Sequence, residues 1–366
     1  TAQNRAYDGT TVAPLGGTAA VTKLGTDDVS LSGTGAGSFA DKNVGNAKPV
    51  TVTGFTLAGN DSGNYNVVQP TGLSANVTQA TLTLSTGNVT KAYDGTTSAA
   101  GAPVVTGGTL FTGDSLSGGS FAFANKNASA GDKVVSVSGV TVSDGNSGAN
   151  YSVSYASNTT STITPAPLTI STNSVTKTYD GNTGAPGTAI VNTGTLYSGD
   201  SLSGGTFTYN DKNVGAGNKT VTVAAVTVND GNGGNNYTVG YASNAASTIS
   251  PANINLSGTQ VYNGGTAFAS SNLAANGVHG ESFALTGSAT LASKNVQTAQ
   301  PLASVAGLTL GAGSGGGVAS NYNPISTANT SVSVTPAQLT YAANAASKTY
   351  GQANPALSGA VTGFVG

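Results

Sequence analysis

A tyrosine, a small polar residue and a glycine recur four times in this chain, each time after a short β-prone run. The tyrosines are spaced by 86, 86 and 83 residues (93 − 7, 179 − 93 and 262 − 179). A fixed period of this size indicates one folded unit that is copied in series. The four copies contain Tyr7, Tyr93, Tyr179 and Tyr262, and the last has Asn263 in place of the aspartate.

Three further landmarks keep the same period. A Lys-Asn pair begins at Lys42, Lys126, Lys212 and Lys294, and an Asn-Tyr pair ends at Tyr65, Tyr151, Tyr237 and Tyr322. A closing Pro-Ala step begins at Pro165, Pro251 and Pro336, with Gln79-Ala80 in the first copy. We therefore predict repeats at residues 1–80, 81–166, 167–252 and 253–337, followed by the incomplete start of another repeat at 338–366. The first repeat lacks the opening strand of later copies, and the segment is expected to be an excerpt of a longer chain.

The composition excludes several classes of function. Only 7% of the residues are charged and the formal net charge is −2, so the chain lacks the basic footprint of a nucleic-acid-binding protein and any polybasic segment for anionic lipid. There is no cysteine, which rules out disulfides and thiolate metal sites. No signal peptide and no run of 18 apolar residues is found, so no membrane span is expected.

Apolar residues alternate with polar ones in short runs separated by Gly, Asn and Asp, which is typical of β-strands. No apolar stripe of period 3.6 has a useful length, so almost no helix is expected. The pattern predicts an all-β fold of tandem, small immunoglobulin-like β-sandwiches that form an extended rod. In the third copy the strands are expected at 168–171, 175–179, 188–192, 202–209, 219–228, 236–242 and 246–250.

The aromatic residues follow the strand alternation and are therefore expected in the core. Tyr237, Val239 and Tyr241 lie at period two, as do Tyr151, Val153 and Tyr155 in the second copy. The residue three before each recurring lysine is apolar in every copy: Phe39, Phe123, Tyr209 and Leu291. This regularity favours core packing over a platform for stacking a ligand.

The Tyr-Asp-Gly step is interpreted as a strand end followed by a turn. The tyrosine ring can enter the core with its hydroxyl at the rim, Asp can cap its own backbone, and Gly accepts positive φ. In the fourth copy Gln260 replaces the cation at Arg5, Lys91 and Lys177, and the aspartate is lost as well. This joint loss predicts that cation and anion form an exposed ion pair in the other copies, worth about 0–1 kcal/mol.

No catalytic, cofactor-binding or metal-binding residue is predicted. The single histidine, His279, lies beside Glu281 in a glycine-rich loop and has no counterpart in the other copies. The acidic pair Asp27-Asp28 is not repeated as a pair either. Acid–base catalysis needs a partnered base, and the sequence does not offer one.

Two hypotheses about how the repeats are stabilised remain open, a calcium site and an isopeptide bond. The loops 144–150 and 230–236, which begin with Asp144 and Asp230, offer the oxygen atoms that calcium prefers, although simple Asx-Gly turns are favoured. An internal isopeptide bond from Lys126 or Lys212 to an asparagine is the second device, and it would need an adjacent buried acid.

Taken together, the motifs resemble the YDG-repeat domain: Lys-x-Tyr-Asp-Gly-x-Thr, Gly-Asp-Ser-Leu-Ser-Gly, Asp-Lys-Asn-Val-Gly, Asn-Tyr and a closing Thr-Pro-Ala. Residues 350–366 are similar to the companion MBG module, which is mostly β and glycine-rich. The resemblance covers nearly the whole chain, with departures at Gln260 and Asn263. It implies the stalk region of a filamentous-haemagglutinin-like adhesin exported by two-partner secretion, and it implies no catalytic residues.

The expected function is therefore a non-enzymatic stalk on the bacterial cell surface that projects an adhesive region for attachment or biofilm formation. Its expected partners are the neighbouring repeats of the same chain. Two alternatives remain: the repeats bind extracellular polysaccharide or another polar surface such as ice through Thr-rich strands such as 220–223, or they build an extracellular filament. Exopolysaccharide or a host or cell surface is a further expected partner, through regions outside this segment. A continuous β-solenoid is a third architecture, although no sub-period of about 20–30 residues is seen within the 86-residue unit.

Overall fold

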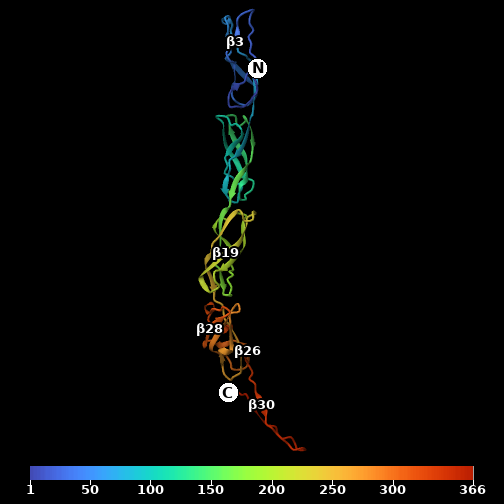
Figure 1. Cartoon of the computed structure of the whole chain (residues 1–366), viewed down its shortest axis with the longest axis vertical. Helices are drawn as coiled ribbons and strands as arrows, with labels where there is room; N and C mark the ends of the chain where they lie inside the picture. Colours follow the sequence, from blue (N-terminus) through green and yellow to red (C-terminus); the bar gives the residue numbers. More distant parts are fainter. Residues whose placement is uncertain (366) are drawn as a thin grey trace. The chain divides into compact units, whose positions relative to one another are not determined.

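The structure is a computed structural model that describes residues 1–365, and within these residues it is built of β-strands and loops (Figure 1). Helical turns among them are limited to single 3₁₀ turns at Ser62–Asn64, Ser270–Asn272, Ala319–Asn321 and Thr327–Asn329. The predicted all-β class and the near absence of helix are confirmed. The strands form several separate sheets, so the alternative of one continuous solenoid is wrong.

Repeat 2 shows the sandwich most clearly. One sheet has the order β10 (Pro103–Gly108), β8 (Ala80–Thr86), β13 (Tyr151–Tyr155). The other has the order β11 (Ser115–Phe123), β12 (Ser129–Ser143), β14 (Asn158–Thr164), β9 (Thr90–Ala92). The opening strand β8 is central in its sheet, antiparallel to β10 and parallel to β13. Its side chains Leu82 and Leu84 are fully buried.

Repeat 3 has seven strands where the sequence predicts seven. They are β15 (Ala166–Thr172), β16 (Thr176–Thr178), β17 (Ala189–Gly194), β18 (Ser201–Tyr209), β19 (Gly215–Asn229), β20 (Tyr237–Tyr241) and β21 (Asn244–Ser250). The sheet orders β17-β15-β20 and β16-β21-β19-β18 match those of repeat 2. The Gly/Asn/Asp clusters therefore mark the strand ends to within a few residues.

Repeat 1 has the same plan without its opening strand. Its larger sheet has the order β1 (Arg5–Ala6), β7 (Leu73–Thr78), β5 (Gly45–Thr53), β4 (Ala36–Phe39), β2 (Val12–Ala13). The second sheet is reduced to β3 (Ser30–Ser32) paired with β6 (Thr56–Ala58). Residues 16–22 and 65–70 form no strand.

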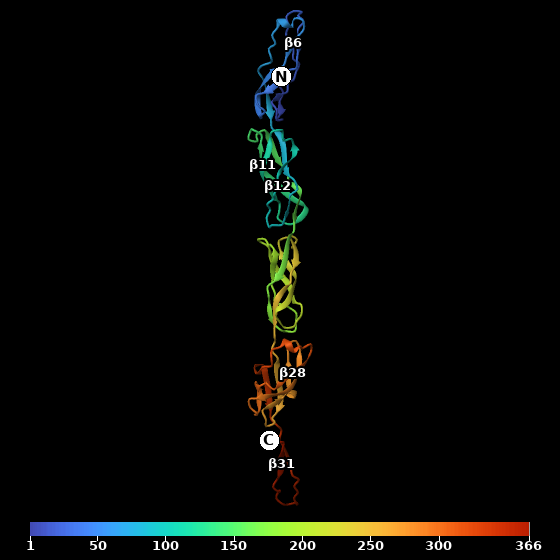
Figure 2. The same ribbon diagram turned by 90° about the vertical axis from the view of Figure 1, so that its left-hand side faces the viewer.

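Repeat 4 departs most from this plan. It has a main sheet of β23 (Ala267–Ala269), β25 (Ser282–Leu291), β24 (Leu273–Asn276), β22 (Asn255–Val261), β29 (Thr330–Thr335) and β26 (Gln297–Gln300). Strands β27 (Leu302–Ser304) and β28 (Leu308–Ser314) also pair with β25. Beyond it, β30 (Thr340–Ala343) and β31 (Gly359–Thr362) form a hairpin (Figure 2).

The aromatic core is confirmed at most, but not all, of the predicted positions. The residues three before the lysines, Phe39, Phe123, Tyr209 and Leu291, are all buried. The prediction is wrong for Tyr155 and Tyr241, which are 42% and 44% exposed. Both lie at the ends of edge strands, and their hydroxyls accept from the backbone N–H groups of Val140 and Val226.

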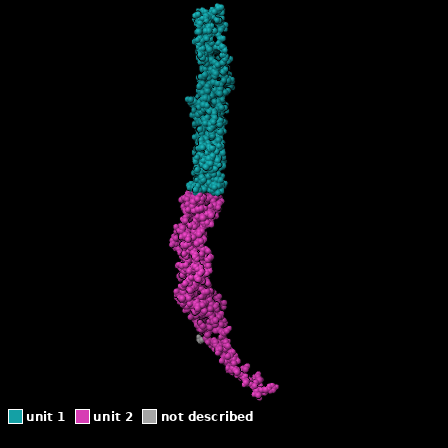
Figure 3. Space-filling view, in the orientation of Figure 1, with its two compact units in different colours: residues 1–167, 197–200, 230–238 teal, residues 168–196, 201–229, 239–366 magenta. Residues whose placement is uncertain are grey.

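Contacts divide the chain into two compact units (Figure 3). The first holds residues 1–167 together with 197–200 and 230–238, and the second holds the remaining described residues. The two short segments of the first unit belong to repeat 3: 197–200 is a loop, and 230–238 is a loop followed by the first two residues of β20. Their contacts with the end of repeat 2 form the site described next.

Candidate functional site: a buried carboxylate cluster at each repeat boundary

One acidic side chain is buried at each boundary between successive repeats. The acids are Asp114, Asp200 and Glu281, and their side chains are 0%, 1% and 0% exposed. Each follows a tight turn in which its own backbone N–H donates to the carbonyl three residues earlier, at a distance of 3.0 Å in all three. The acid therefore sits in the same local structure each time, supplied by the later repeat.

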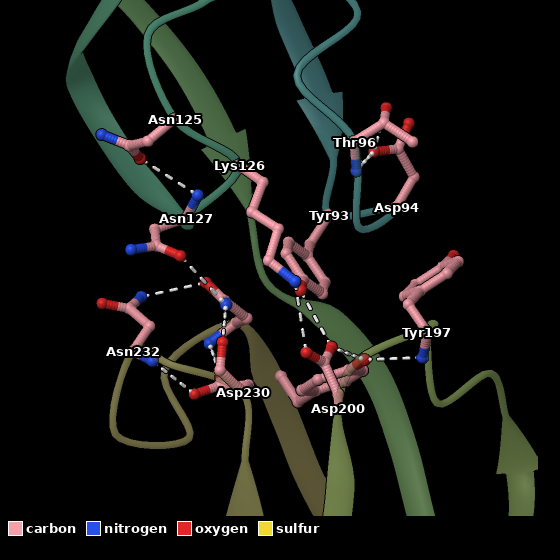
Figure 4. A network of polar contacts seen from close by, with 12 residues as sticks. Tyr93, Asp94, Thr96, Asn125, Lys126, Asn127, Tyr197, Asp200, Asp230 and Asn232 are labelled. Carbon is pink, nitrogen blue, oxygen red and sulfur yellow. Dashed lines mark hydrogen bonds and ion pairs between the residues drawn. The ribbon is translucent and has the colours of Figure 1, made fainter.

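The earlier repeat provides two donors to this acid, as Figure 4 shows for Asp200. The hydroxyl of Tyr93, from Tyr-Asp-Gly, donates to Asp200 Oδ2 at 2.8 Å. The ammonium of Lys126, from the recurring Lys-Asn pair, lies 3.3 Å from Asp200 Oδ1. The same two donors serve the other acids: Tyr7 and Lys42 for Asp114, and Tyr179 and Lys212 for Glu281.

A second tyrosine, from the Asn-Tyr pair of the later repeat, completes the cluster. Tyr237 donates its hydroxyl to Asp200 Oδ2 at 2.7 Å and accepts from the backbone N–H of Tyr197 at 2.9 Å. Its ring meets that of Tyr93 edge to face, with centroids 5.3 Å apart. Tyr151 and Tyr322 make the corresponding bonds to Asp114 and Glu281 at 2.7 Å. We call the acid, the two tyrosines and the lysine the carboxylate cluster.

The asparagine of the Asn-Tyr pair forms a second contact across the boundary. Asn236 is fully buried, and its Oδ1 accepts from the backbone N–H of Ala128 in repeat 2 at 2.7 Å. Asn150 and Asn321 bind Val44 and Val214 in the same way. Each boundary is therefore bonded at two places besides the chain connection.

The loops considered for calcium hold this asparagine in place. Asp230 is 3% exposed; its Oδ1 accepts from the backbone N–H groups of Asn232 and Gly234, and its Oδ2 from that of Asn236. Burial would raise the pKa of Asp230, but these backbone bonds outweigh it and lower the pKa. Asp144 has the same arrangement. Both carboxylates already bind N–H donors, which favours the interpretation as turns over calcium ligands.

We predict that chelation leaves the chain unchanged. If calcium were structural, its removal would lower the melting midpoint, since a ligand at 100 times its dissociation constant stabilises a fold by about 2.7 kcal/mol. Melting with and without EDTA measures the effect. A drop of several degrees would contradict this prediction and would make Asp144 and Asp230 ligands.

Three of the four recurring lysines, Lys42, Lys126 and Lys212, form ion pairs with the buried acids and are not poised as nucleophiles. Lys212 lies 3.0 Å from Glu281 Oε1. Hydrogen bonds to Glu281 and Tyr179 raise the pKa of Lys212, while burial would raise the pKa of Glu281 but the donated hydrogen bonds lower it. An isopeptide bond needs a neutral amine. The raised pKa of Lys126, which hydrogen bonding to Tyr93 causes in the same way, also favours the ion pair.

The cluster predicts a loss of stability in alkali. Burial, and then the bond to Asp200, raise the pKa of Tyr237, and the pKa values of Tyr93 and Lys126 are raised as well. A group with a raised folded pKa contributes stability that is complete below its unfolded value of about 10 and is lost as pH rises through the folded value. We expect the melting midpoint to fall progressively above about pH 10. A midpoint that is constant or rises from pH 9 to pH 11.5 would contradict the role of the cluster.

The glycine of Tyr-Asp-Gly also packs at the boundary. Gly181 has φ +81°, and a Cβ there would lie 2.6 Å from Cβ of His279 in the next repeat. His279 itself has φ +54°. This places the histidine in a packing role at the boundary.

Replacing Gly181 by valine is therefore expected to destabilise the chain by about 1–3 kcal/mol, because it combines a left-handed backbone with a steric clash. The matched control is Gly184→Val, since Gly184 lacks a positive φ and has open space at its Cβ position. Urea denaturation of both variants measures the difference. Equal midpoints would show that the glycine is incidental.

The predicted cation–anion partners are confirmed, but only the aspartates are exposed, since the side chains of Arg5, Lys91 and Lys177 are 8%, 17% and 10% exposed. Lys91 and Lys177 lie 2.7 Å from Asp94 and Asp180, and Arg5 contacts Asp8. Asp94 also accepts from the backbone N–H of Thr96, and the glycine that follows it has positive φ. The Tyr-Asp-Gly turn therefore has the local chemistry that the sequence predicts, while its tyrosine hydroxyl reaches the next repeat.

Two acids that seemed isolated in the sequence belong to the recurring set. Glu281 is the counterpart of Asp114 and Asp200. Asp27 is the counterpart in repeat 1: Tyr65 donates to its Oδ2 at 2.6 Å and accepts from the backbone N–H of Leu24. The sequence does contain a sign of this set: Asp114 and Asp200 are separated by 86 residues (200 − 114), which equals the repeat period.

The described residues contain no helix long and apolar enough to cross a membrane. A family model for the YDG domain matches four stretches of the chain, residues 1–72, 78–160, 164–248 and 244–331. Neither a curated protein nor a solved structure matches the chain.

Proposed function

Because the chain belongs to the YDG domain family, we propose that it is a non-enzymatic structural spacer, a row of repeats that carries an adhesive region of a large surface protein away from a bacterial cell. The observation that carries this proposal is the carboxylate cluster, which recurs at all three boundaries between repeats. A spacer must resist bending where its units meet, and each of these boundaries holds a buried acid.

The geometry of a boundary supports stiffness. Strand β14 ends at Thr164 and β15 begins at Ala166, so Pro165 alone separates the last strand of repeat 2 from the first strand of repeat 3. Proline fixes φ and keeps the connection extended. The cluster and the asparagine contact then bond the same boundary at two further places. The connection and these two contacts attach repeat 2 to the adjoining loops of repeat 3 at three places.

The cluster also supports a role without catalysis. A buried ion pair contributes specificity of assembly more than net stability, because the two charges must be removed from water. Here each acid is surrounded by two hydroxyl donors and an ammonium, so its oxygens are engaged in holding the boundary. Such an arrangement fixes the register of one repeat on the next.

We further propose that the spacer acts outside the cell, as part of a filamentous-haemagglutinin-like adhesin exported by two-partner secretion. The support is the resemblance of the motifs and the absence of cysteine, which lets the repeats fold without an oxidant. Attachment and biofilm formation are the roles that such a spacer would serve.

Small-angle scattering tests the spacer directly. If each repeat is about 30–40 Å long, as strands of roughly eight residues at about 3.3 Å per residue would give, four in series have a maximum dimension on the order of 150 Å. A compact globule of this length would have a radius of gyration of about 21 Å. A measured radius of gyration close to that of the globule would contradict the proposal of a spacer.

A second candidate function is glycan binding, which the exposed rings of Tyr155 and Tyr241 favour. Aromatic faces are the usual platforms for sugar rings, and the two tyrosines occupy the same position in repeats 2 and 3. Titration with exopolysaccharide, with Tyr155→Ala and Tyr241→Ala as variants, tests this function. Binding that both substitutions weaken would support it, and no binding by the wild-type chain would exclude it.

A further inference from the structure

The groups that receive the buried acid are the same at every boundary, although the acid is not. Each earlier repeat offers the tyrosine of Tyr-Asp-Gly and the lysine of Lys-Asn: Tyr7 and Lys42, Tyr93 and Lys126, and Tyr179 and Lys212. Each also offers one backbone N–H to the buried asparagine of the later repeat, from Val44, Ala128 or Val214. We call these three donors the socket. The difference between boundaries lies in the later repeat, which brings aspartate to two sockets and glutamate to the third.

The glutamate stands on a different turn. In repeats 2 and 3 the positive φ of the turn before the acid falls on one central residue, Gly113 (+94°) or Gly199 (+91°). In repeat 4 both central residues have a positive φ, +54° at His279 and +78° at Gly280. Positive φ at both positions is typical of the type I′ turn of a β-hairpin. The strands that flank this turn, β24 and β25, do pair directly, whereas β10 and β11 of repeat 2 belong to different sheets.

The turn also meets the earlier repeat at a different residue. A Cβ placed at Gly95 would lie 3.0 Å from the Cβ of Tyr197, which is the first residue of its turn. A Cβ placed at Gly181 would instead lie 2.6 Å from the Cβ of His279, which is the second residue of the turn that begins at Val278. Relative to the glycine of Tyr-Asp-Gly, the turn of repeat 4 is therefore shifted by one residue.

The longer side chain nevertheless brings its carboxylate to the same donors. The tyrosine hydroxyl of the socket lies 2.9, 2.8 and 2.7 Å from the carboxylates of Asp114, Asp200 and Glu281. The ammonium of the socket lies 2.9, 3.3 and 3.0 Å from them. Glu281 accepts from both donors of repeat 3 with Oε1 and from Tyr322 of its own repeat with Oε2. The extra methylene group of the glutamate thus offsets the different turn.

We propose that the socket is a common docking surface for the acidic ends of repeats 2, 3 and 4. The length of the acid is matched to the turn of its own repeat, glutamate on the hairpin turn and aspartate on the other, and not to the repeat that receives it. Repeat 4 should therefore dock on repeat 2 as it docks on repeat 3. A whole repeat could then be lost or gained without a new kind of boundary. This inference rests on the carboxylate cluster and does not depend on the role of the chain as a spacer.

A chain that lacks residues 167–252 tests the common surface. The deletion joins Ala166 to Asn253 and keeps the Pro-Ala-Asn sequence with which repeat 4 naturally begins. Repeat 4 then follows repeat 2 directly, and Glu281 should accept from the tyrosine and the lysine of the repeat 2 socket.

The amide hydrogen of Ala128 is the probe, because it donates across the boundary to Asn236 at 2.7 Å. In the shortened chain Asn321 should accept in its place, and protection of Ala128 from hydrogen exchange should stay within about threefold of its value in the chain with all repeats. Glu281→Asp in the shortened chain should lower this protection by at least about tenfold. An unprotected Ala128 in a shortened chain whose strands remain protected would overturn the common surface.

Two variants of the whole chain test the matched acid length without a deletion. Asp200→Glu keeps the charge but adds a methylene group on a turn that fits aspartate, and protection of Ala128 should fall by at least about tenfold because a packed site must then shift. The matched control Asp94→Glu makes the same change at a side chain that is 43% exposed, and protection of Ala128 should be unchanged. Equal protection in these two variants would overturn the matching of acid and turn, whether or not the shortened chain folds.

Discussion

Replacing Asp114 by alanine is expected to lower the free energy of unfolding by about 3–5 kcal/mol, the usual cost of removing one partner from a buried ion pair. The side chain of Asp114 is fully buried, and it accepts from the hydroxyls of Tyr7 and Tyr151 and from the ammonium of Lys42. Alanine would leave the ammonium and both hydroxyls without their acceptor. Urea denaturation of the full chain, followed by its total tyrosine fluorescence, measures the loss.

The matched control is Asp94→Ala. Asp94 also pairs with a lysine, Lys91, but it is 43% exposed. Exposed pairs contribute about 0–1 kcal/mol, so this variant should lose far less stability than Asp114→Ala. If the two variants lost the same amount, the buried cluster would have no special part in holding the repeats together.

The second large effect is expected for Asp230→Ala, at about 3 kcal/mol. Three backbone N–H groups donate to Asp230, and a buried donor left without an acceptor costs about 1–3 kcal/mol. Water can reach part of the loop and bind some of these N–H groups. The expected loss of stability is therefore smaller than the summed cost of three unpaired donors. The Asn236 contact across the boundary should loosen as well, because Asp230 holds its backbone.

Asn235→Ala is the control in the same loop, since Asn235 is exposed and its side chain bonds only the carbonyl of Asn232. Thermal melting of both variants is the measurement. Equal melting midpoints would contradict the structural role of Asp230.

The parts of the fold that depend on short-range chemistry could be predicted from the sequence. Alternation and Gly/Asn/Asp clusters predicted the seven strands of repeat 3. The turn at Tyr-Asp-Gly and the pairs Lys91–Asp94 and Lys177–Asp180 involve residues three apart, so the sequence shows both partners together. Tyr155 and Tyr241 are an exception, since alternation alone does not show that their strands lie at a sheet edge.

The carboxylate cluster could not be predicted in this way, because its members come from two repeats. Tyr7 and Asp114 are 107 residues apart, a distance that joins one repeat to the next rather than any position to its own copy. In the last repeat the acid is a glutamate, Glu281, and it follows Asp200 after 81 residues (281 − 200). In this copy the acidic residue type and its spacing from the previous acid both differ, while the same hydrogen bond closes the turn before the acid.

The loops at Asp144 and Asp230 show a second limit. Their oxygen-rich composition fits both a cation site and a turn, and only the direction of the N–H groups distinguishes the two. In the structure three N–H groups point at each carboxylate. The amino-acid composition of a loop does not show where its backbone N–H groups point.

If a buried acid fixes one repeat on the next, a distance measured across the boundary of repeats 1 and 2 should have a narrow distribution. The chain has no cysteine, so cysteines introduced at the exposed positions Thr51 and Ser136 would carry the only two spin labels. Pulsed electron resonance should give one narrow distance distribution for the otherwise wild-type chain. With Asp114→Ala added, the distribution should broaden while circular dichroism shows that the strands remain. A broad distribution with Asp114 present, or an equally narrow one without it, would contradict the account.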